Sequence, residues 1–347
     1  MTITRRRFNT LAASTLAVPW IHARAADPLA NLYEAAKKEG ELTWYIVFLP
    51  SEDAETMGRT FTKRYPGIKV NVVRTTAQVA FQRLNQDIKA SSANCDVFSS
   101  TDVGHYVDLK ARKLLTQFTP ESTSRLDKRL QGIDPDGYFH VANLFMVGLL
   151  YNTNKVTAAE APTSWADLLD PKWMGLGATG HPGFSGAVGT WAIEMRRLYG
   201  DEWFDKLAAN KPHVGRSIID TVTTLNSGER SVSAGPLTLA ARVAAKGNPI
   251  GSVAPKEGPV MIVSPSGILA NAPHPNAAKL FSEWLISSDD TDQLTRELYG
   301  VPRRPGVKPL PGVIGMDDVE NVLIPTPEES VAQRPEVIEL WRDAFGV

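Results

Sequence analysis

Residues 42–73 of this 347-residue chain read LTWYIVFLPSEDAETMGRTFTKRYPGIKVNVV. The first seven residues are rich in β-branched and aromatic side chains, which predicts a strand over 42–48. A polar segment with spaced apolar positions follows and ends at Pro66-Gly67, which predicts a helix over 52–65. Residues 68–73 then predict a second strand. A strand, a helix and another strand in this order indicate an α/β fold with mainly parallel strands.

The same alternation continues along the chain. A helix is predicted after the second strand because apolar residues recur there at helical spacing, at Ala77, Phe81, Leu84 and Ile88. A third strand is predicted over 95–99, with Asp102 as N-cap of the next helix. Further strands are predicted near residues 176–179, 231–234 and 260–263. Further helices are predicted near residues 164–169, over residues 237–245, and in a segment that begins at about residue 185. Residues 302–311, rich in Pro, Gly and basic residues, predict a surface connection.

The first twenty-five residues predict an export signal peptide. Arg5, Arg6 and Arg7 precede an uncharged, mostly apolar run over 11–21, and Ala23-Arg24-Ala25 supplies a cleavage pattern. The segment TRRRF at 4–8 resembles a twin-arginine signal, which makes the twin-arginine translocase the expected export partner. An ordinary secretory signal with the same layout is the alternative. In either case we expect a periplasmic protein cleaved near Ala25.

The charge balance of the mature chain excludes a strongly basic nucleic-acid binder. The whole sequence has 37 basic and 38 acidic residues, and four of the arginines lie in the predicted signal. The chain from Ala26 onward therefore carries a formal charge of −5, with 33 basic and 38 acidic residues. Its single cysteine, Cys95, cannot form an internal disulfide and is predicted to be a small buried side chain.

Four stretches resemble the periplasmic solute-binding proteins of ABC importers, in the branch that includes ferric-ion and phosphosugar binders. The most specific is LYNTNK at 150–155 followed by PTSWADLLDPKW at 162–173. The others are DVFSS at 96–100, FSGA at 184–187 and HPNAAKLF at 274–281.

The resemblance implies a two-lobed type II periplasmic binding fold. Each lobe would be a mainly parallel sheet flanked by helices, with a ligand cleft between the lobes that closes by a hinge motion. The expected division is 26–140 plus 264–315 for lobe 1 and 141–263 plus 316–347 for lobe 2. The implied partners are an ABC permease and its ATPase in the inner membrane. We expect a monomer that needs no cofactor.

Ser185-Gly186-Ala187 is the leading candidate for the ligand site. These residues open a predicted helix, and the unpaired N–H groups of a helix N-terminus favour a phosphate or carboxylate. A simple N-cap role for Ser185 uses the same geometry and is the alternative. The resemblance favours the anion interpretation, because the three positions match the family's anion-holding Ser-Gly-Ala.

The remaining candidates are expected mainly at strand ends, where ligands bind in open α/β sheets. Arg74 and Arg216 are the candidate cations for an acid group, although a solvated arginine is the alternative for Arg74. The four residues from 99 to 102 offer hydroxyls and one carboxylate, or else only a helix cap. The full set is Phe48, Arg74, Thr75, Ser99, Ser100, Thr101, Asp102, Tyr151, His181, Ser185, Gly186, Ala187, Arg216, Pro236 and Glu257.

The sequence differs from the iron-binding members of the family that it resembles at the positions of their iron ligands. As the resemblance implies, the iron-binding members hold iron with two adjacent tyrosines, a histidine and an acid. The corresponding positions in this chain lie near Pro236 and Leu237 for the tyrosines, near Leu49 for the histidine and near Thr101 for the acid. No Tyr-Tyr pair occurs in this chain. Ferric iron favours anionic oxygen donors such as phenolate and carboxylate. We therefore predict a small organic solute bearing a carboxylate, phosphate or phosphonate, with ferric iron as the alternative ligand.

Two enzyme motifs give weaker alternatives to a binding protein. GFSGA at 183–187 lacks the final glycine of the G-x-S-x-G nucleophile elbow, although Asp220 and His274 follow in hydrolase order. An exported serine hydrolase using Ser185 is thus a remote alternative. GLGATG at 175–180 precedes HPG where a dinucleotide-binding motif would open a helix, so a glycine-rich strand and turn are predicted there.

Overall fold

The computed structural model describes residues 28–92 and 94–346. The predicted export signal therefore lies outside the described residues. The strands are β1 (Glu41–Ile46), β2 (Lys69–Arg74), β3 (Val97–Ser99), β4 (Phe139–Asn152), β5 (Gly177–Thr179), β6 (His213–Val214), β7 (Val232–Pro236), β8 (Ile250–Val253) and β9 (Val260–Ile268).

The helices alternate with these strands, as the sequence pattern predicts. They are α1 (Pro28–Glu39), α2 (Ser51–Arg64), α3 (Ala77–Lys89), α4 (Val103–Ala111), α5 (Gly186–Tyr199), α6 (Glu202–Ala209), α7 (Asp220–Asn226), α8 (Leu237–Ala245), α9 (Pro275–Ser287), α10 (Asp289–Glu297) and α11 (Pro327–Phe345). Short 3-10 helices cover Glu121–Arg125, Lys128–Leu130, Trp165–Leu169 and Pro171–Trp173.

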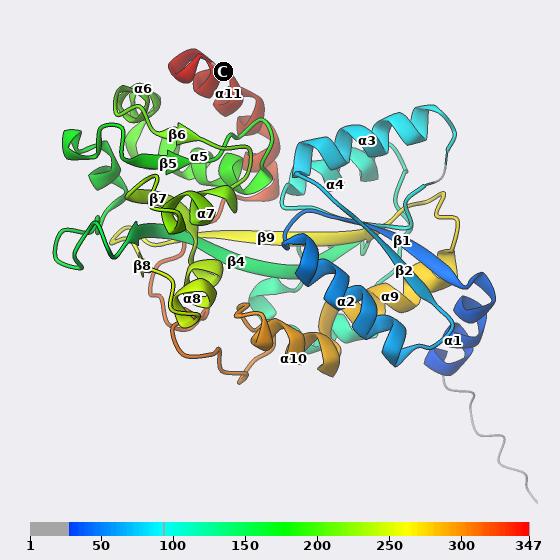
Figure 1. Cartoon of the computed structure of the whole chain (residues 1–347). Helices are drawn as coiled ribbons and strands as arrows, with labels where there is room; N and C mark the ends of the chain where they lie inside the picture. Colours follow the sequence, from blue (N-terminus) through cyan, green and yellow to red (C-terminus); the bar gives the residue numbers. More distant parts are fainter. Residues whose placement is uncertain (1–27, 93, 347) are drawn as a thin grey trace, which may run out of the picture.

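A single sheet runs through the whole molecule in the order β2-β1-β3-β9-β4-β7-β5-β6, with β8 also paired to β4. The outer strands are parallel: β1 pairs with β2 and β3, and β5 pairs with β6 and β7. The two long strands in the middle, β4 and β9, are antiparallel to each other and cross from one half of the molecule to the other (Figure 1). The predicted α/β fold is confirmed, and the antiparallel pair joins its two lobes.

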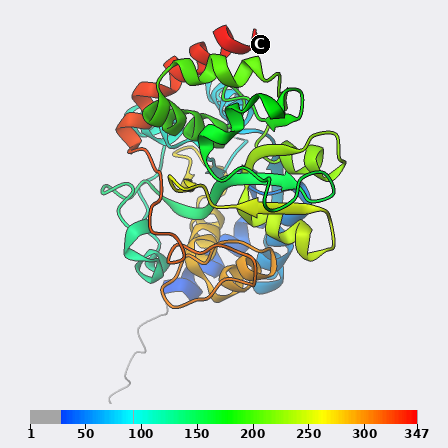
Figure 2. The ribbon, with the colours of Figure 1, turned by 90° about the vertical axis from the view of Figure 1, so that its left-hand side faces the viewer.

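The helices divide between the two lobes. α1 to α4, α9 and α10 lie with β1 to β3, and α5 to α8 lie with β5 to β8 (Figure 1). We propose the division expected from the sequence, with residues 316–347 in lobe 2. Helix α11 packs beside α5 and α6 of that lobe and also contacts α4 of lobe 1 (Figure 2).

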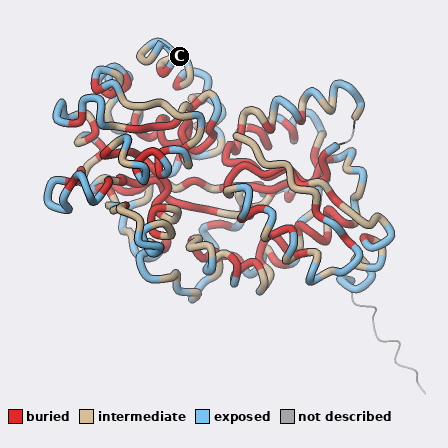
Figure 3. The backbone as a smooth tube through the Cα atoms, viewed as in Figure 1, coloured by how far each residue is buried: buried red, intermediate tan, exposed pale blue. Residues whose placement is uncertain are grey.

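Buried chain runs through both lobes and continues along the crossing strands (Figure 3). The largest buried side chains are mostly aromatic. In lobe 1, Phe281 packs edge-on against Trp44 and Phe61, with ring centroids 5.1 Å apart in each pair. In lobe 2, Trp191 packs against Trp203 at 5.2 Å. Because burying one such side chain contributes roughly 1.5–3 kcal/mol, aromatic packing stabilises both lobes, and one hydrophobic cluster extends from lobe 1 into lobe 2.

Two local predictions are confirmed by the side chains. Asp102 caps α4 by accepting a hydrogen bond from the Gly104 N–H at 3.0 Å. Cys95 is a buried free thiol, and burial raises its pKa well above the usual value. The segment near 164–169 is helical but of the 3-10 type, and it begins with a capping box formed by Ser164 and Asp167.

The prediction of a surface connection at 302–311 is wrong at Arg303, whose side chain is fully buried. The β4–β9 register shifts between Val141 and Asn143, which marks a bulge at Ala142. Arg303 Nη1 donates to the carbonyl of Ala142 and, at 3.2 Å, to that of Leu285. Burial lowers the pKa of Arg303 to about 10, so the guanidinium stays charged at neutral pH. Within the described part of the chain, no helix combines the length and apolarity needed to span a bilayer.

Candidate ligand-binding cleft

The two lobes touch each other directly in this structure. The Gln78 N–H at the start of α3 donates to the Phe184 carbonyl of lobe 2 at 3.2 Å. Asp53 on α2 forms an ion pair with Arg242 on α8. A Cβ placed on Gly186 would lie 2.8 Å from the Thr101 carbonyl carbon. These contacts define a closed arrangement of the lobes.

A small cavity lies at the junction, between α3 of lobe 1 and α5 of lobe 2. It measures about 20 Å³, and we call it the polar compartment. Its walls are Val47, Phe48, Thr76, Ala77, Thr101, Phe145, Ser185, Ala187, Ser217, Ile218 and Ile219. One water-sized group needs about 10–15 Å³, so the closed compartment holds little more than one such group.

Two helix N-termini face the polar compartment from opposite lobes. Thr76 and Ala77 begin α3, and Ser185 and Ala187 lie at the start of α5. Each helix carries a partial positive charge at this end and N–H groups without intrahelical partners. The convergence of two such ends favours a negatively charged ligand.

The hydroxyl groups of Ser185 and Thr76, at the starts of these two helices, differ in whether they form a cap hydrogen bond. Ser185 Oγ accepts the Val188 N–H at 3.4 Å, a long cap hydrogen bond. Thr76 is the N-cap of α3, but its side chain makes no cap hydrogen bond. Its Oγ1 is buried and has no hydrogen-bond partner among the described residues. Because a buried hydroxyl is normally hydrogen-bonded, Thr76 Oγ1 marks a position suited to a polar ligand atom.

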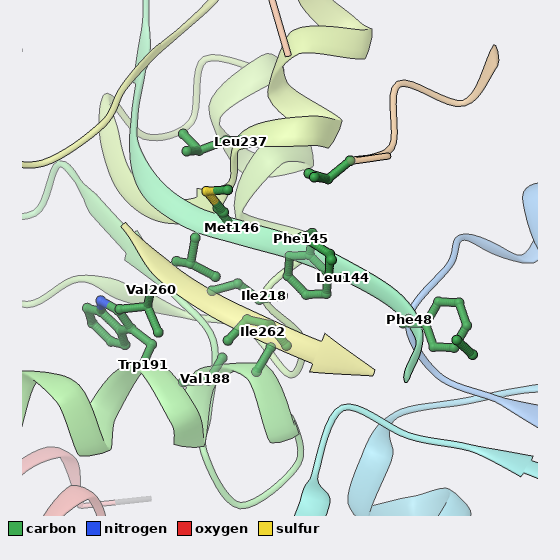
Figure 4. Close-up of a cluster of buried hydrophobic side chains, with 14 of the residues drawn as sticks. Phe48, Leu144, Phe145, Met146, Val188, Trp191, Ile218, Leu237, Val260 and Ile262 are labelled. Carbon is green, nitrogen blue, oxygen red and sulfur yellow. The ribbon is translucent and has the colours of Figure 1, made fainter. Parts of the chain in front are cut away.

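A larger cavity of about 70 Å³ adjoins the polar compartment and shares Phe48, Phe145 and Ile219 with it. We call it the apolar chamber, because eleven of its eighteen lining residues are apolar. It lies between α2 and the end of α10 on one side and β4 and α8 on the other. In Figure 4, Phe145 and Leu144 project from β4, while Phe48 comes from the lobe 1 chain.

Six of the predicted site residues lie at these two cavities. Thr101, Ser185 and Ala187 line the polar compartment, Pro236 lines the apolar chamber and Phe48 lines both. Gly186 forms the close approach to Thr101 described above.

Three predicted residues of lobe 1 line neither cavity, because other side chains hold them. Ser99 Oγ accepts from the Trp44 indole at 2.8 Å and bonds Ser266. Ser100 Oγ lies 3.0 Å from His105 Nδ1. Asp102 accepts from Gln78 Nε2 at 2.9 Å and lies 3.5 Å from Arg334 Nε. Burial opposes the charge on Asp102, but Arg334 and His105 outweigh it and lower its pKa.

Two predicted residues lie within lobe 2, and neither lines the described cavities. Tyr151 pairs with Gly251 across β4 and β8, and its ring covers that glycine. Glu257 accepts from the Tyr199 hydroxyl at 2.5 Å and from Ser164 Oγ. Burial works against the ionised form of Glu257, yet these hydrogen bonds lower its pKa.

The other four predicted residues border the cleft without lining either cavity. Arg74 Nε donates to the Leu49 carbonyl at 3.0 Å, and burial lowers the pKa of Arg74. Thr75 follows the end of β2. The Arg216 guanidinium lies over the Phe184 ring, 4.8 Å from its centroid. His181 accepts the Gly183 N–H at 2.9 Å and packs against Phe184.

Sequence reasoning missed the apolar walls of the cleft. Thr76 and Ser217 are recognisable from the sequence, because each directly follows a predicted site residue in a strand-end loop. Apolar walls such as Leu239 give no such signal, because their pattern is that of ordinary helix and strand interiors.

The hydrolase arrangement does not assemble. His274 Nδ1 lies 3.0 Å from Asp96 in lobe 1, and Asp220 accepts the Ser217 N–H at 2.9 Å. Ser185 is thus left as a helix cap beside the cavity. Within residues 28–92 and 94–346, no three of the His, Cys, Asp and Glu side chains gather as a metal site would require.

The fold and its cleft define a type II periplasmic binding fold, and comparison with known proteins agrees. The family of bacterial extracellular solute-binding proteins matches residues 92–310, more than half of the chain. The protein therefore belongs to that family, which confirms the resemblance stated from the sequence. An uncharacterised protein of Haemophilus influenzae is 24% identical over 244 residues, covering 68% of this chain and 70% of that protein.

Two solved structures show the same fold. The periplasmic binding protein AfuA of Actinobacillus pleuropneumoniae, with fructose-6-phosphate bound, matches with a TM-score of 0.78 at 20% identity, over 89% of this chain and 99% of that one. Iron-bound HitA of Pseudomonas aeruginosa matches with a TM-score of 0.74 at 20% identity, over 88% of this chain and 99% of that one. At this identity the likeness concerns the fold and leaves the ligand open.

Proposed function

We propose that this protein is the periplasmic substrate-binding component of an ABC importer that captures a small anionic organic solute. The observation that carries the proposal is the convergence of the α3 and α5 N-termini on one compartment, beside the unpartnered Thr76 hydroxyl. A carboxylate, phosphate or phosphonate group fits this donor set. The solute binds between the open lobes, and closure brings both helix ends onto its charge.

Delivery would follow from the same closure. A ligand that contacts both lobes binds the closed state better and shifts the population toward it. The permease then receives the closed, loaded protein, and its ATPase drives release. Export through the twin-arginine translocase and a monomeric state are parts of the same proposal.

A thermal-shift screen of the mature protein tests the ligand class. We expect at least one carboxylate, phosphate or phosphonate compound to raise the unfolding midpoint, because ligand at ~100 times its Kd adds roughly 2.7 kcal/mol. Native mass spectrometry of the protein purified from its host would show the mass of a retained solute. Stabilisation by ferric salts and by no organic anion would make iron the cargo.

Ser185→Asp tests the position of the anion. Aspartate is as good an N-cap as serine, so α5 should still form, but the added charge faces the anion and should reduce the affinity at least tenfold. The matched control is Thr326→Asp, which makes the same change at the exposed N-cap of α11. Equal affinities of the two variants, measured by calorimetry, would place the anion elsewhere.

A further inference from the structure

The apolar chamber constrains the body of the solute as well as its charge. Its walls include Met57 of α2, Leu239 of α8 and Leu298 just after α10, so residues from both lobes enclose it. It shares Phe48, Phe145 and Ile219 with the polar compartment, which makes the two spaces adjoining parts of one cleft. A solute with its acid group at the helix ends would therefore extend into this chamber.

The charged groups at the chamber have partners within the protein. Arg242 pairs with Asp53 across the lobes. Arg303 donates through Nη1 to two main-chain carbonyls, those of Ala142 and Leu285, and its buried Nε has no hydrogen-bond partner among the described residues. A solute that carries a hydroxyl on each carbon would bury several polar groups here against mostly hydrocarbon walls. Burying a hydroxyl without a hydrogen bond is unfavourable, so such a solute is a poor fit.

The size of the chamber sets the size of the apolar group. Its 70 Å³ is roughly five times the volume that one water-sized group needs. A short alkyl chain or a single ring has about this bulk. The polar compartment, at about 20 Å³, has room only for part of a small head group before the lobes adjust.

We infer that the solute is an amphipathic organic acid: one acid group at the helix ends of α3 and α5, and a compact hydrocarbon chain or ring in the apolar chamber. This inference rests on the proposed function and adds the chemical class of the solute body. It separates this protein from binders of polyhydroxylated phosphosugars, because the chamber offers apolar contact where a sugar needs hydrogen bonds.

The test compares acids that share a head group and differ in the body. Hexanoate and gluconate both have six carbons and one carboxylate, and acetate has the head group with almost no body. We expect hexanoate to bind at least tenfold more tightly than gluconate and acetate in calorimetric titrations. Benzoate and phenylphosphonate extend the series to rings. Equal or tighter binding of gluconate, or of glucose 6-phosphate, would overturn the inference.

A variant of the chamber wall gives a second, independent readout. Leu239 is only partly buried, so Leu239→Asn should fold, and it should weaken hexanoate binding about tenfold while leaving acetate unchanged. The control is Leu198→Asn, an exposed leucine of α5 that does not line the chamber. Uniform loss of hexanoate and acetate would show that Leu239 has no specific contact with the solute body and would count against the inference.

The series also separates the two proposals. If acetate, hexanoate and gluconate bind equally and Ser185→Asp abolishes binding of all three, the anion site stands and the apolar chamber plays no part. If no organic anion binds at all, the proposed function fails, and the inference fails with it.

Discussion

Gly186 shows how one residue can set the distance between the lobes. It is the first residue of α5, and a Cβ there would lie 2.8 Å from the carbonyl carbon and 2.9 Å from the next amide nitrogen of lobe 1, at Thr101 and Asp102. Real Cβ atoms essentially never approach this closely, and main-chain atoms cannot rotate away as a side chain can. The closed arrangement therefore requires glycine at this position.

Gly186→Val should hold the lobes apart without unfolding either of them. The position is helical, where valine has a higher propensity than glycine, so the helical backbone itself does not oppose the change. We expect at least a tenfold loss of ligand affinity and a larger radius of gyration with ligand present, measured by small-angle X-ray scattering. Ala209→Val, at an exposed position of α6, is the control. A ligand-bound variant as compact as the wild type would refute the steric argument.

The sequence predicts part of the cleft because strand ends and helix starts carry recognisable polar residues. Ser185 and Thr101 were found in this way. Ser99 fits the same pattern but turns into lobe 1, where it bonds Trp44. Period-two alternation in a strand of three residues is too short to tell which side chain faces the cleft. That choice is made by tertiary partners, which a single sequence does not display.

Helix α11 links the lobes at the scale of a secondary-structure element. Its C-terminal half is anchored in lobe 2, where Trp341 packs among the rings of Trp191 and Phe204. Arg334 near its middle donates to the Gly186 carbonyl at 2.8 Å and to Thr190 at 3.2 Å, both on α5. The same guanidinium lies 3.5 Å from Asp102 of lobe 1. One arginine thus connects the proposed anion helix with the opposite lobe.

Removing this arginine should favour the open arrangement. Arg334→Met leaves Asp102 with a buried charge and one counter-ion fewer, and breaking a buried pair costs about 3–5 kcal/mol. We expect a lower unfolding midpoint and weaker ligand binding. The Arg334→Met and Asp102→Asn double-mutant cycle measures their coupling, expected at about 0.5–3 kcal/mol.

Arg342→Met serves as the control for α11, because Arg342 is exposed and pairs only with Glu339 on the same helix among the described residues. The substitution should change the free energy of unfolding by no more than about 0.5 kcal/mol. Additive effects of Arg334 and Asp102 in the cycle would mean that the two lobes are not coupled through this pair.

Most elements of the first lobe follow from local pattern, and α8 has the bounds predicted from the sequence. The link made by α11 does not follow in this way. Arg334 lies in a helix with exposed neighbours, where an arginine usually faces solvent. Its burial depends on Asp102 and on α5, which are more than 140 residues away in the sequence.

The stability of the whole molecule should fall as the pH drops from about 6.5 to about 4. Burial lowers the pKa of His105 from 6.5 to about 4, because the ring stacks on Phe81 and its nitrogens bond Ser100 and Gln78. In this window the unfolded chain takes up a proton that the folded chain does not. The free energy of unfolding should therefore decrease by about 3 kcal/mol on acidification.

Chemical denaturation at several pH values measures this slope, and His105→Gln should flatten it because glutamine does not titrate. Asp102 affects the free energy of unfolding mainly below this pH window. The pKa of Asp102 is lower than the usual 3.8, so the stability that its ionised form contributes is lost only as the pH falls through that lower value. Identical slopes for the variant and the wild type would show that His105 does not carry the effect.

The bulge at Ala142 has a consequence for how this protein diversifies. It lies on β4, which both lobes share, and its carbonyl is held by the buried Arg303 from a distant part of the chain. The bulge is also part of the cleft, because Ala142 and Arg303 both line the apolar chamber. A substitution at either residue would therefore alter the strand that joins the lobes and the wall that meets the solute in a single step, so ligand preference and transport kinetics are expected to evolve together.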